Sequence, residues 1–138
     1  MPPTAGLRIF SDMRFSQDSF AINSIRAYGD GEITINDKTI VESVVITADS
    51  IQLWEPRSID ELTAAHIDRL GELDPEIVII GTGRQLVFPA PAVTASLQVR
   101  GIGVEIMAHA AACRTFNILL AEDRRVLAAL MMGPTPLL

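Results

Sequence analysis

The feature that most constrains the fold is a short, continuously apolar run at Glu76–Gly81 (EIVIIG). A strand without polar alternation is buried on both faces, which is typical of a parallel sheet covered by helices. Two more such runs follow at Gly103–Ala108 and Arg125–Met131, and helix-length segments at Ala92–Val99 and Ala110–Ala121 separate the three. Because crossovers of this kind are right-handed and return to the same sheet, we expect three parallel strands in a βαβαβ arrangement.

The first fifty residues are patterned as antiparallel strands instead. Ser19–Tyr28 and Glu32–Ile35 flank the turn Gly29–Gly31, which is a hairpin signal, and the β-branched run Lys38–Ala48 predicts a third strand. The predicted fold class is therefore mixed α/β, with N-terminal antiparallel strands joined to a parallel sheet and its covering helices. A chain of 138 residues has the usual size of one domain, so we expect a single domain over residues 1–138.

A helix is predicted between these two halves. Ser58 and Glu61 have the spacing of a capping box, in which a hydroxyl and a carboxylate satisfy backbone amides of the first helical turn. The helix should begin at Ile59 and end at Asp74-Pro75.

The charge is distributed unevenly along the chain. The net charge of −6 argues against nucleic acid as a partner, because the phosphate backbone requires a surplus of basic residues. Residues 1–76 hold 14 acidic and 6 basic residues, a balance of −8, whereas residues 77–138 hold 3 and 5, a balance of +2. A small anionic ligand at the second half is therefore compatible with the overall acidity.

Targeting signals are not evident. The N-terminal sequence lacks a basic segment followed by an apolar run, and the longest uncharged stretch, Gln85–Val99, is interrupted by Pro89 and Pro91 and is too short to span a membrane. The single cysteine, Cys113, fits a reducing compartment. We predict a cytoplasmic protein of bacterial type that does not span the membrane.

Two glycines mark one candidate binding site. Gly81, Thr82 and Gly83 follow the first predicted parallel strand, at the end where ligands bind in open α/β sheets, and Arg84 beyond them could meet an anion. The segment matches neither the dinucleotide fingerprint nor the phosphate loop. The alternative is a tight turn that uses left-handed glycine conformations.

The start of the third predicted helix is the second candidate. Helix amides and the Arg114 guanidinium both favour a thiolate at Cys113, although a buried, inert thiol is the alternative. His109 stands four residues before Cys113, a spacing that places two metal ligands on one helix face, but two ligands do not complete a zinc site and His66 lies on another predicted helix. We predict no metal and no cofactor.

No catalytic constellation accompanies these residues. The chain has no nucleophile-elbow motif, and the acidic residues between Asp60 and Glu76 are typical of a solvated helix face. Trp54 lies in a connection, where an aromatic side chain either covers the core or anchors a partner. The sequence therefore leans against an enzyme.

Three segments together carry a family resemblance. They are the pattern I-x-x-Y-G-x-G-x-I at Ile25–Ile33, the segment EIVIIGTG from Glu76, and GIGVEIMAHAAACRTFNILLAEDRRVLAALM at Gly101–Met131. As a set they resemble the MTH-like domain family of unknown function, whose eukaryotic relatives include mitochondrial respiratory complex I assembly factor 3 and an adipogenesis-associated MTH-like domain protein. The resemblance implies a layered α/β fold that combines antiparallel and parallel strands, and it implies no reaction. His109 departs from it, standing where a small hydroxyl residue, commonly Thr, is expected.

The candidate ligand or partner site combines the two regions, and Asn117 joins it as a motif position of the family. Its residues are Gly81, Thr82, Gly83, Arg84, His109, Cys113, Arg114 and Asn117. The leading hypothesis is a noncatalytic protein-interaction domain that assembles respiratory complex I or another membrane complex, with membrane-complex subunits among its protein partners. The alternative is a small-anion-binding protein or enzyme with a cleft at the C-terminal ends of the parallel strands. A homo-oligomer formed through exposed apolar residues, including the tail Pro134–Leu138, is a third possibility.

Overall fold

The computed structural model describes residues 22–134. The elements, in chain order, are β1 (Ile25–Gly29), β2 (Glu32–Ile35), β3 (Lys38–Ile40), β4 (Val44–Ile46), β5 (Ile51–Leu53), the 3₁₀ turn η1 (Ile59–Glu61), α1 (Ala64–Leu70), the 3₁₀ turn η2 (Gly71–Leu73), β6 (Ile77–Gly81), α2 (Pro91–Val99), β7 (Gly103–Met107), α3 (His109–Ala121) and β8 (Val126–Leu130).

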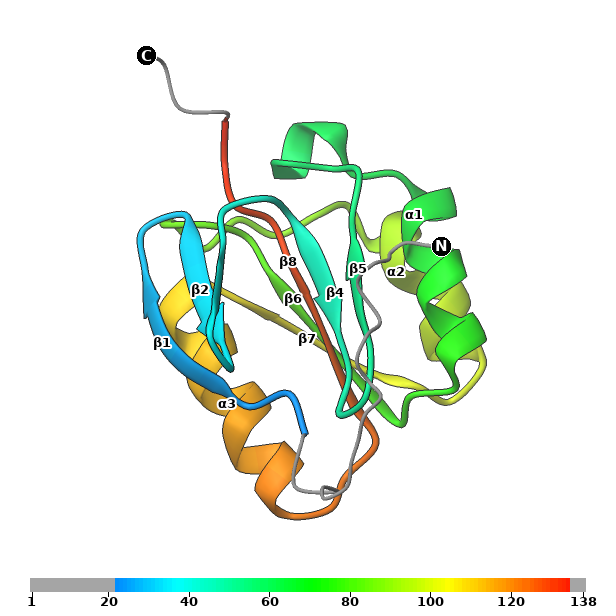
Figure 1. Ribbon diagram of the computed structural model, residues 1–138. Coiled ribbons are helices and arrows are strands. Elements are labelled where there is room, and N and C mark those ends of the chain that lie inside the picture. Colours follow the sequence, from blue (N-terminus) through cyan, green and yellow to red (C-terminus); the bar gives the residue numbers. More distant parts are fainter. Residues whose placement is uncertain (1–21, 135–138) are drawn as a thin grey trace.

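The strands form two sheets, and the helices cover both faces of the larger one (Figure 1). The smaller sheet is antiparallel, in the order β1-β2-β3, and the larger has the order β5-β4-β8-β6-β7. Within the larger sheet β6 is parallel to both β7 and β8, whereas β4 is antiparallel to β8 and to β5. The predicted mixed α/β fold class and the three parallel strands are confirmed.

Two hydrophobic cores lie on opposite faces of the five-stranded sheet, because successive side chains of a strand point to opposite sides. Ala128 and Leu130 of β8 pack with Phe116 of α3 in the core that the small sheet also covers. Leu127, the residue before Ala128, points to the other side and packs with Leu97 of α2 in the core beneath α1 and α2. The continuously apolar strands of the sequence therefore correspond to strands buried on both faces.

The prediction for the third N-terminal strand is wrong, because Lys38–Ala48 contributes to both sheets. β3 pairs with β2, and after a short connection β4 enters the five-stranded sheet between β5 and β8. The carbonyl oxygen of Ser43, just before β4, accepts a hydrogen bond from Trp54 N–H at 2.9 Å. A β-branched run indicates strand conformation but not the sheet to which a strand belongs. The three-residue strand β5 was not predicted.

The predicted start of the first helix is also wrong. Ser58 makes no capping hydrogen bond, and only the 3₁₀ turn η1 follows it. The Glu61 carboxylate accepts instead from Arg57 N–H at 2.9 Å. Thr63 caps α1: its hydroxyl accepts from His66 N–H at 3.2 Å, and His66 Nδ1 accepts from Thr63 N–H at 3.0 Å. A histidine therefore has the role that the sequence pattern gave to a glutamate.

The other predicted boundaries agree with the structure to within about two residues, except at the chain ends. The strand predicted from Ser19 begins too early, because residues 22–24 are not in a strand and β1 begins at Ile25. Its part up to residue 21 lies outside the described residues, as do tail residues 135–138. Among residues 22–134 no helix is long and apolar enough to cross a membrane.

Candidate functional site

The structure brings the two candidate regions together. The end of β6 and the start of α3 are joined by backbone hydrogen bonds, from His109 N–H to the Gly83 carbonyl oxygen at 2.7 Å and from Thr82 N–H to the Met107 carbonyl oxygen at 2.8 Å. α2 and α3 leave neighbouring parallel strands toward opposite faces, the place where open sheets often form a ligand crevice. In this chain, backbone hydrogen bonds between the end of β6 and the start of α3 join the two sides of that position.

The two glycines have packing and conformational roles. A Cβ at Gly81 would lie 2.8 Å from Leu130 Cδ2 and 3.4 Å from Ala112 Cβ, so glycine lets β6 approach α3 and β8 closely. Gly83 has a φ of +93°, which a residue with a side chain adopts only under strain. The tight-turn interpretation accounts for both positions.

His109 is buried against the hairpin formed by β1 and β2. Its Nε2 donates to the Glu32 carbonyl oxygen at 2.9 Å, and Tyr28 meets the imidazole edge-on with ring centroids 6.4 Å apart. In this tautomer Nδ1 is an acceptor, and among the described residues it has no hydrogen-bond partner. His109 therefore leaves one unsatisfied buried atom at the start of α3.

Cys113 is completely buried, one helical turn beyond His109. Burial raises the pKa of the Cys113 thiol to about 12, against the smaller opposing effect of the Arg114 charge. The thiol is therefore protonated at neutral pH and out of reach of solvent. Burial agrees with the inert-thiol interpretation of the sequence.

The remaining polar residues of the set bind the hairpin to its surroundings. Arg84 Nε lies 3.6 Å from Asp30 Oδ2 in the hairpin turn, with both side chains largely exposed. Arg114 Nη1 donates to the Tyr28 hydroxyl at 3.1 Å. Both guanidinium groups therefore have partners within the chain, across a solvated surface.

Asn117 connects α3 to the first strand. Its Oδ1 accepts from Ile25 N–H and its Nδ2 donates to the Ile25 carbonyl oxygen, both at 2.8 Å. The side-chain amide thus replaces a neighbouring strand along the edge of β1. We call the contact of His109, Cys113, Arg114 and Asn117 with the β1-β2 hairpin the α3–hairpin joint.

An exposed apolar loop follows Gly83 and Arg84 in the chain. Leu86, Val87 and Phe88 are 50%, 39% and 69% exposed, and we call them the apolar loop. Thr82 fixes its base, since its hydroxyl donates to the Gln85 carbonyl oxygen at 2.6 Å and accepts from Val87 N–H at 3.2 Å. The exposure of this loop was not predicted, although three apolar residues before Pro89 and Pro91 indicate a surface loop.

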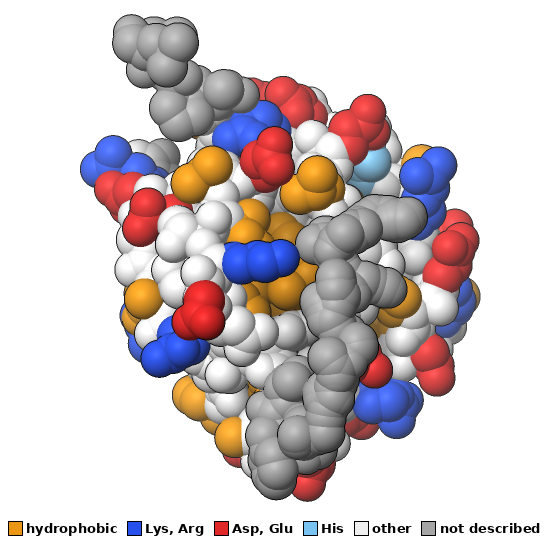
Figure 2. Space-filling model, viewed as in Figure 1, with side chains coloured by type: hydrophobic (Ala, Val, Ile, Leu, Met, Phe, Trp, Pro, Cys, Tyr) orange, Lys and Arg blue, Asp and Glu red, His pale blue; other side chains and the backbone are white. Residues whose placement is uncertain are grey.

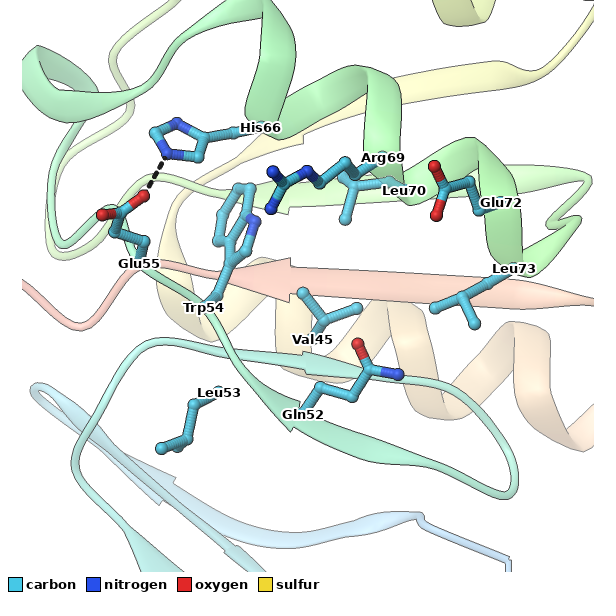
Figure 3. A pocket seen from close by; sticks show the side chains of 10 residues that line it. All are labelled: Val45, Gln52, Leu53, Trp54, Glu55, His66, Arg69, Leu70, Glu72 and Leu73. Atoms are coloured by element: carbon cyan, nitrogen blue, oxygen red, sulfur yellow. Dashed lines mark hydrogen bonds and ion pairs between the residues drawn. The ribbon is translucent and has the colours of Figure 1, made fainter. Parts of the chain in front are cut away.

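A groove between β5 and α1 forms a second surface feature, with a volume of about 310 Å³ (Figure 3). Its lining residues come from both strands β4 and β5 and from the helical segment: Val45, Gln52, Leu53, Trp54, Glu55, His66, Arg69, Leu70, Glu72 and Leu73. Trp54 lines the groove and also packs against the core beneath α1 and α2. The two roles proposed for Trp54 from the sequence are therefore compatible with one position.

One wall of the groove is held by His66. Its Nε2 lies 2.9 Å from Glu55 Oε1, and its ring meets Trp54 edge-on with centroids 6.5 Å apart. Because Nδ1 accepts from the N-cap amide of α1, Nε2 is the donor to the carboxylate. The cap of α1 and the wall of the groove thus share one side chain.

A second cavity, of about 490 Å³, lies at the amino-terminal end of β8. Arg124 and Arg125 line it, and Arg124 Nε donates to Glu76 Oε1 at 2.7 Å. This hydrogen bond, helped by the Arg125 N–H, holds the pKa of Glu76 below its ordinary value. Within residues 22–134 no group of three or more His, Cys, Asp and Glu side chains is placed to hold a metal ion.

Fold and surface together define a layered α/β domain whose candidate chemical residues make internal contacts and whose apolar loop and groove face outward. The chain belongs to the family described as a protein of unknown function (DUF498/DUF598), whose family model matches residues 25–131.

The chain is similar to respiratory complex assembly factors and to a bacterial membrane protein. NADH dehydrogenase [ubiquinone] 1 alpha subcomplex assembly factor 3 of Xenopus tropicalis is 28% identical over 88% of this chain and 67% of its own length. The 13 kDa major membrane protein of Francisella tularensis is 26% identical over 73% of this chain and 84% of its own length. Both alignments cover most of the present chain.

Solved structures share the fold. A Bordetella parapertussis protein is 35% identical with a TM-score of 0.77, covering 80% of this chain and 96% of that one. A Bordetella pertussis protein described as a Mth938-like domain is 29% identical with a TM-score of 0.74, covering 89% and 95%. The resemblance to the MTH-like family is confirmed.

Proposed function

We propose that this domain is a noncatalytic protein-interaction module that helps to assemble a membrane-bound respiratory complex. The observation that carries the proposal is the apolar loop, Leu86–Phe88, which exposes three consecutive apolar side chains on a base fixed by Thr82. Complete burial of a fully exposed side chain of this kind is worth about 1.5–3 kcal/mol, and these partly exposed side chains each contribute a fraction of that. A preformed loop loses little conformational freedom on binding, which favours its use as an anchor.

The relatives support the same role. Several are named as assembly factors of NADH dehydrogenase, and another is named as a membrane protein. In this proposal the domain is cytoplasmic and reaches the membrane through protein partners such as subunits of the complex. Its acidity is compatible with this, since protein interfaces do not require the basic surplus that nucleic acids demand.

Affinity purification from gently solubilised native membranes tests the proposal. The wild-type chain should recover respiratory or membrane-biogenesis subunits. The double variant Leu86→Ser/Phe88→Ser should lose at least about tenfold of that recovery, because it removes two apolar anchors. Val99→Ser, which changes a more exposed apolar residue at the end of α2, is the control and should recover as much as wild type. Recovery of no membrane-complex subunit by the wild-type chain would contradict the proposal.

The start of α3 favours a second candidate, the binding of a small anion. Ala108, the N-cap of α3, provides no side-chain acceptor for the amides of the first helical turn. Helix N-termini attract anions, Arg114 lies in the first two turns of α3, and Arg84 follows Gly83, whose carbonyl oxygen accepts from His109 N–H. Phosphate, sulfate and ATP should then raise the melting temperature of wild type but not of Arg84→Ala/Arg114→Ala. Equal melting temperatures with and without these anions would exclude this candidate.

A further inference from the structure

We propose that the groove beside β5 binds an extended segment of a partner protein, which adds a strand to the free edge of the five-stranded sheet. This inference rests on the proposed protein-binding function but concerns a different surface from the apolar loop. β5 is the last strand in the order β5-β4-β8-β6-β7, so one of its edges has no neighbouring strand among residues 22–134. Extended peptides bind such edges through main-chain hydrogen bonds.

The register of β5 shows which backbone groups are free for this pairing. Gln52 lies opposite Val45, and the hydrogen bonds from Trp54 N–H to Ser43 and from Thr47 N–H to Ser50 mark the bonded positions on either side. Because bonded and non-bonded pairs alternate in an antiparallel ladder, Gln52 bonds to β4. The N–H and C=O groups of Ile51 and Leu53 therefore point away from the sheet, where an added strand would meet them.

The groove can accommodate side chains of a bound segment, in addition to the free backbone edge of β5. α1 and η2 form a wall facing β5, with Leu70 and Leu73 toward the sheet and Trp54 at one end (Figure 3). A strand with one free edge beside a helix is the arrangement that lets main-chain bonds supply affinity and alternate side chains supply specificity. On the visible face of the molecule, hydrophobic side chains gather at the centre, and a Lys or Arg side chain lies across them (Figure 2).

Charge identifies the chemistry of the occupant. Glu55 and Glu72 stand at the two ends of the groove, with Arg69 between them (Figure 3). The Glu55 side chain is 86% exposed even though it contacts His66. The complementary occupant is an extended segment with apolar residues at every second position and a Lys or Arg toward each end.

A phage-displayed library of random linear ten-residue peptides, panned on the full chain, tests this inference. Enriched peptides should show that alternation and those basic ends, and their binding should protect the Ile51 and Leu53 amides from hydrogen exchange. Leu53→Pro removes one outward N–H, a change that edge strands tolerate, and should weaken binding of an enriched peptide by about tenfold or more. Leu53→Val keeps the N–H and is the matched control, with an affinity within about threefold of wild type.

Three results would overturn the inference. The first is that no peptide is enriched more on the wild-type chain than on Leu53→Pro. The second is that an enriched peptide binds wild type and Leu53→Pro with equal affinity while both have the same melting profile. The third is a dimer in sedimentation that Leu53→Pro dissociates, which would make a second copy the occupant. Panning uses no membranes, so peptides that enrich while membrane purification recovers nothing would leave this inference standing and contradict only the proposed assembly role.

Discussion

The α3–hairpin joint and the β5–α1 groove contain similar kinds of residues but use them differently. In the joint, Asn117 and the His109 Nε2 bond to backbone groups of the hairpin, and Cys113 is sealed within the core. In the groove, the Glu55 carboxylate is largely exposed, and the edge of β5 has no neighbouring strand among the described residues. The difference teaches that residue type alone does not distinguish a structural contact from an open surface.

The largest expected effect of the difference between joint and groove is a low alkylation rate of the Cys113 thiol in the folded chain. With the pKa of the Cys113 thiol raised from 9.0 to about 12, the thiolate fraction near pH 8 should be roughly 1000-fold lower in the folded chain than in urea. Alkylation with iodoacetamide, followed by mass spectrometry, measures both rates. Rapid modification of the folded chain would show that the joint opens and would restore Cys113 as a candidate nucleophile.

Among changes to the polar residues of the joint, Asn117→Ala should lower the stability of the fold the most. It leaves the N–H and C=O of Ile25 without their partners, and we expect a loss of about 2–3 kcal/mol in the free energy of unfolding by urea. Ile118→Ser, at the next and exposed position of α3, should cost less than about 0.5 kcal/mol. Equal costs for the two variants would mean that Asn117 does not hold the hairpin.

The N-terminal cap of α1 provides a test on the groove side, because His66 belongs both to the cap and to the groove wall. Thr63→Ala should lower the free energy of unfolding by about 1 kcal/mol, because the His66 N–H loses its acceptor. Ser58→Ala, at the cap that the sequence pattern predicts, should leave it nearly unchanged. Thermal unfolding of both variants measures the difference, and a larger effect at Ser58 would contradict the observed helix start.

The smallest expected effect is a dependence on pH at Glu76. Its pKa in the folded chain lies below the ordinary value of 4.5, chiefly because Arg124 donates to the carboxylate. The ion pair therefore stabilises the fold fully above pH 4.5 and is lost as the pH falls through the lower, folded-state pKa. The stability difference between wild type and Glu76→Gln should shrink from pH 6 to pH 3. A constant difference would exclude this linkage.

Sequence reasoning succeeded where one strong local signal decides the structure. The apolar run before Gly81 indicates a strand buried on both faces, and the helix-length segment Ala92–Val99 corresponds to α2. It failed where partners distant in the chain decide. No local pattern tells that β3 and β4 separate into different sheets, or that Glu61 bonds to Arg57 rather than capping a helix.

The candidate site shows the same division. The order of the strands makes the juxtaposition of Gly83 with the start of α3 predictable. The hydrogen-bond partners of His109 and Asn117 were not predictable, because these partners lie on the hairpin, more than 70 residues earlier in the chain. The apolar loop and the groove depend on exposure, which residue type alone does not specify.

The most direct test of the central claim, that the domain acts through its exposed surface rather than through chemistry at the joint, is a quantitative comparison of partner recovery from native membranes. Wild type, Leu86→Ser/Phe88→Ser and Arg84→Ala/Arg114→Ala would be purified side by side, with melting temperatures confirming that each is folded. The account predicts that the loop variant loses its membrane-complex subunits and that the arginine variant retains them. Loss in the arginine variant with full recovery by the loop variant would contradict it.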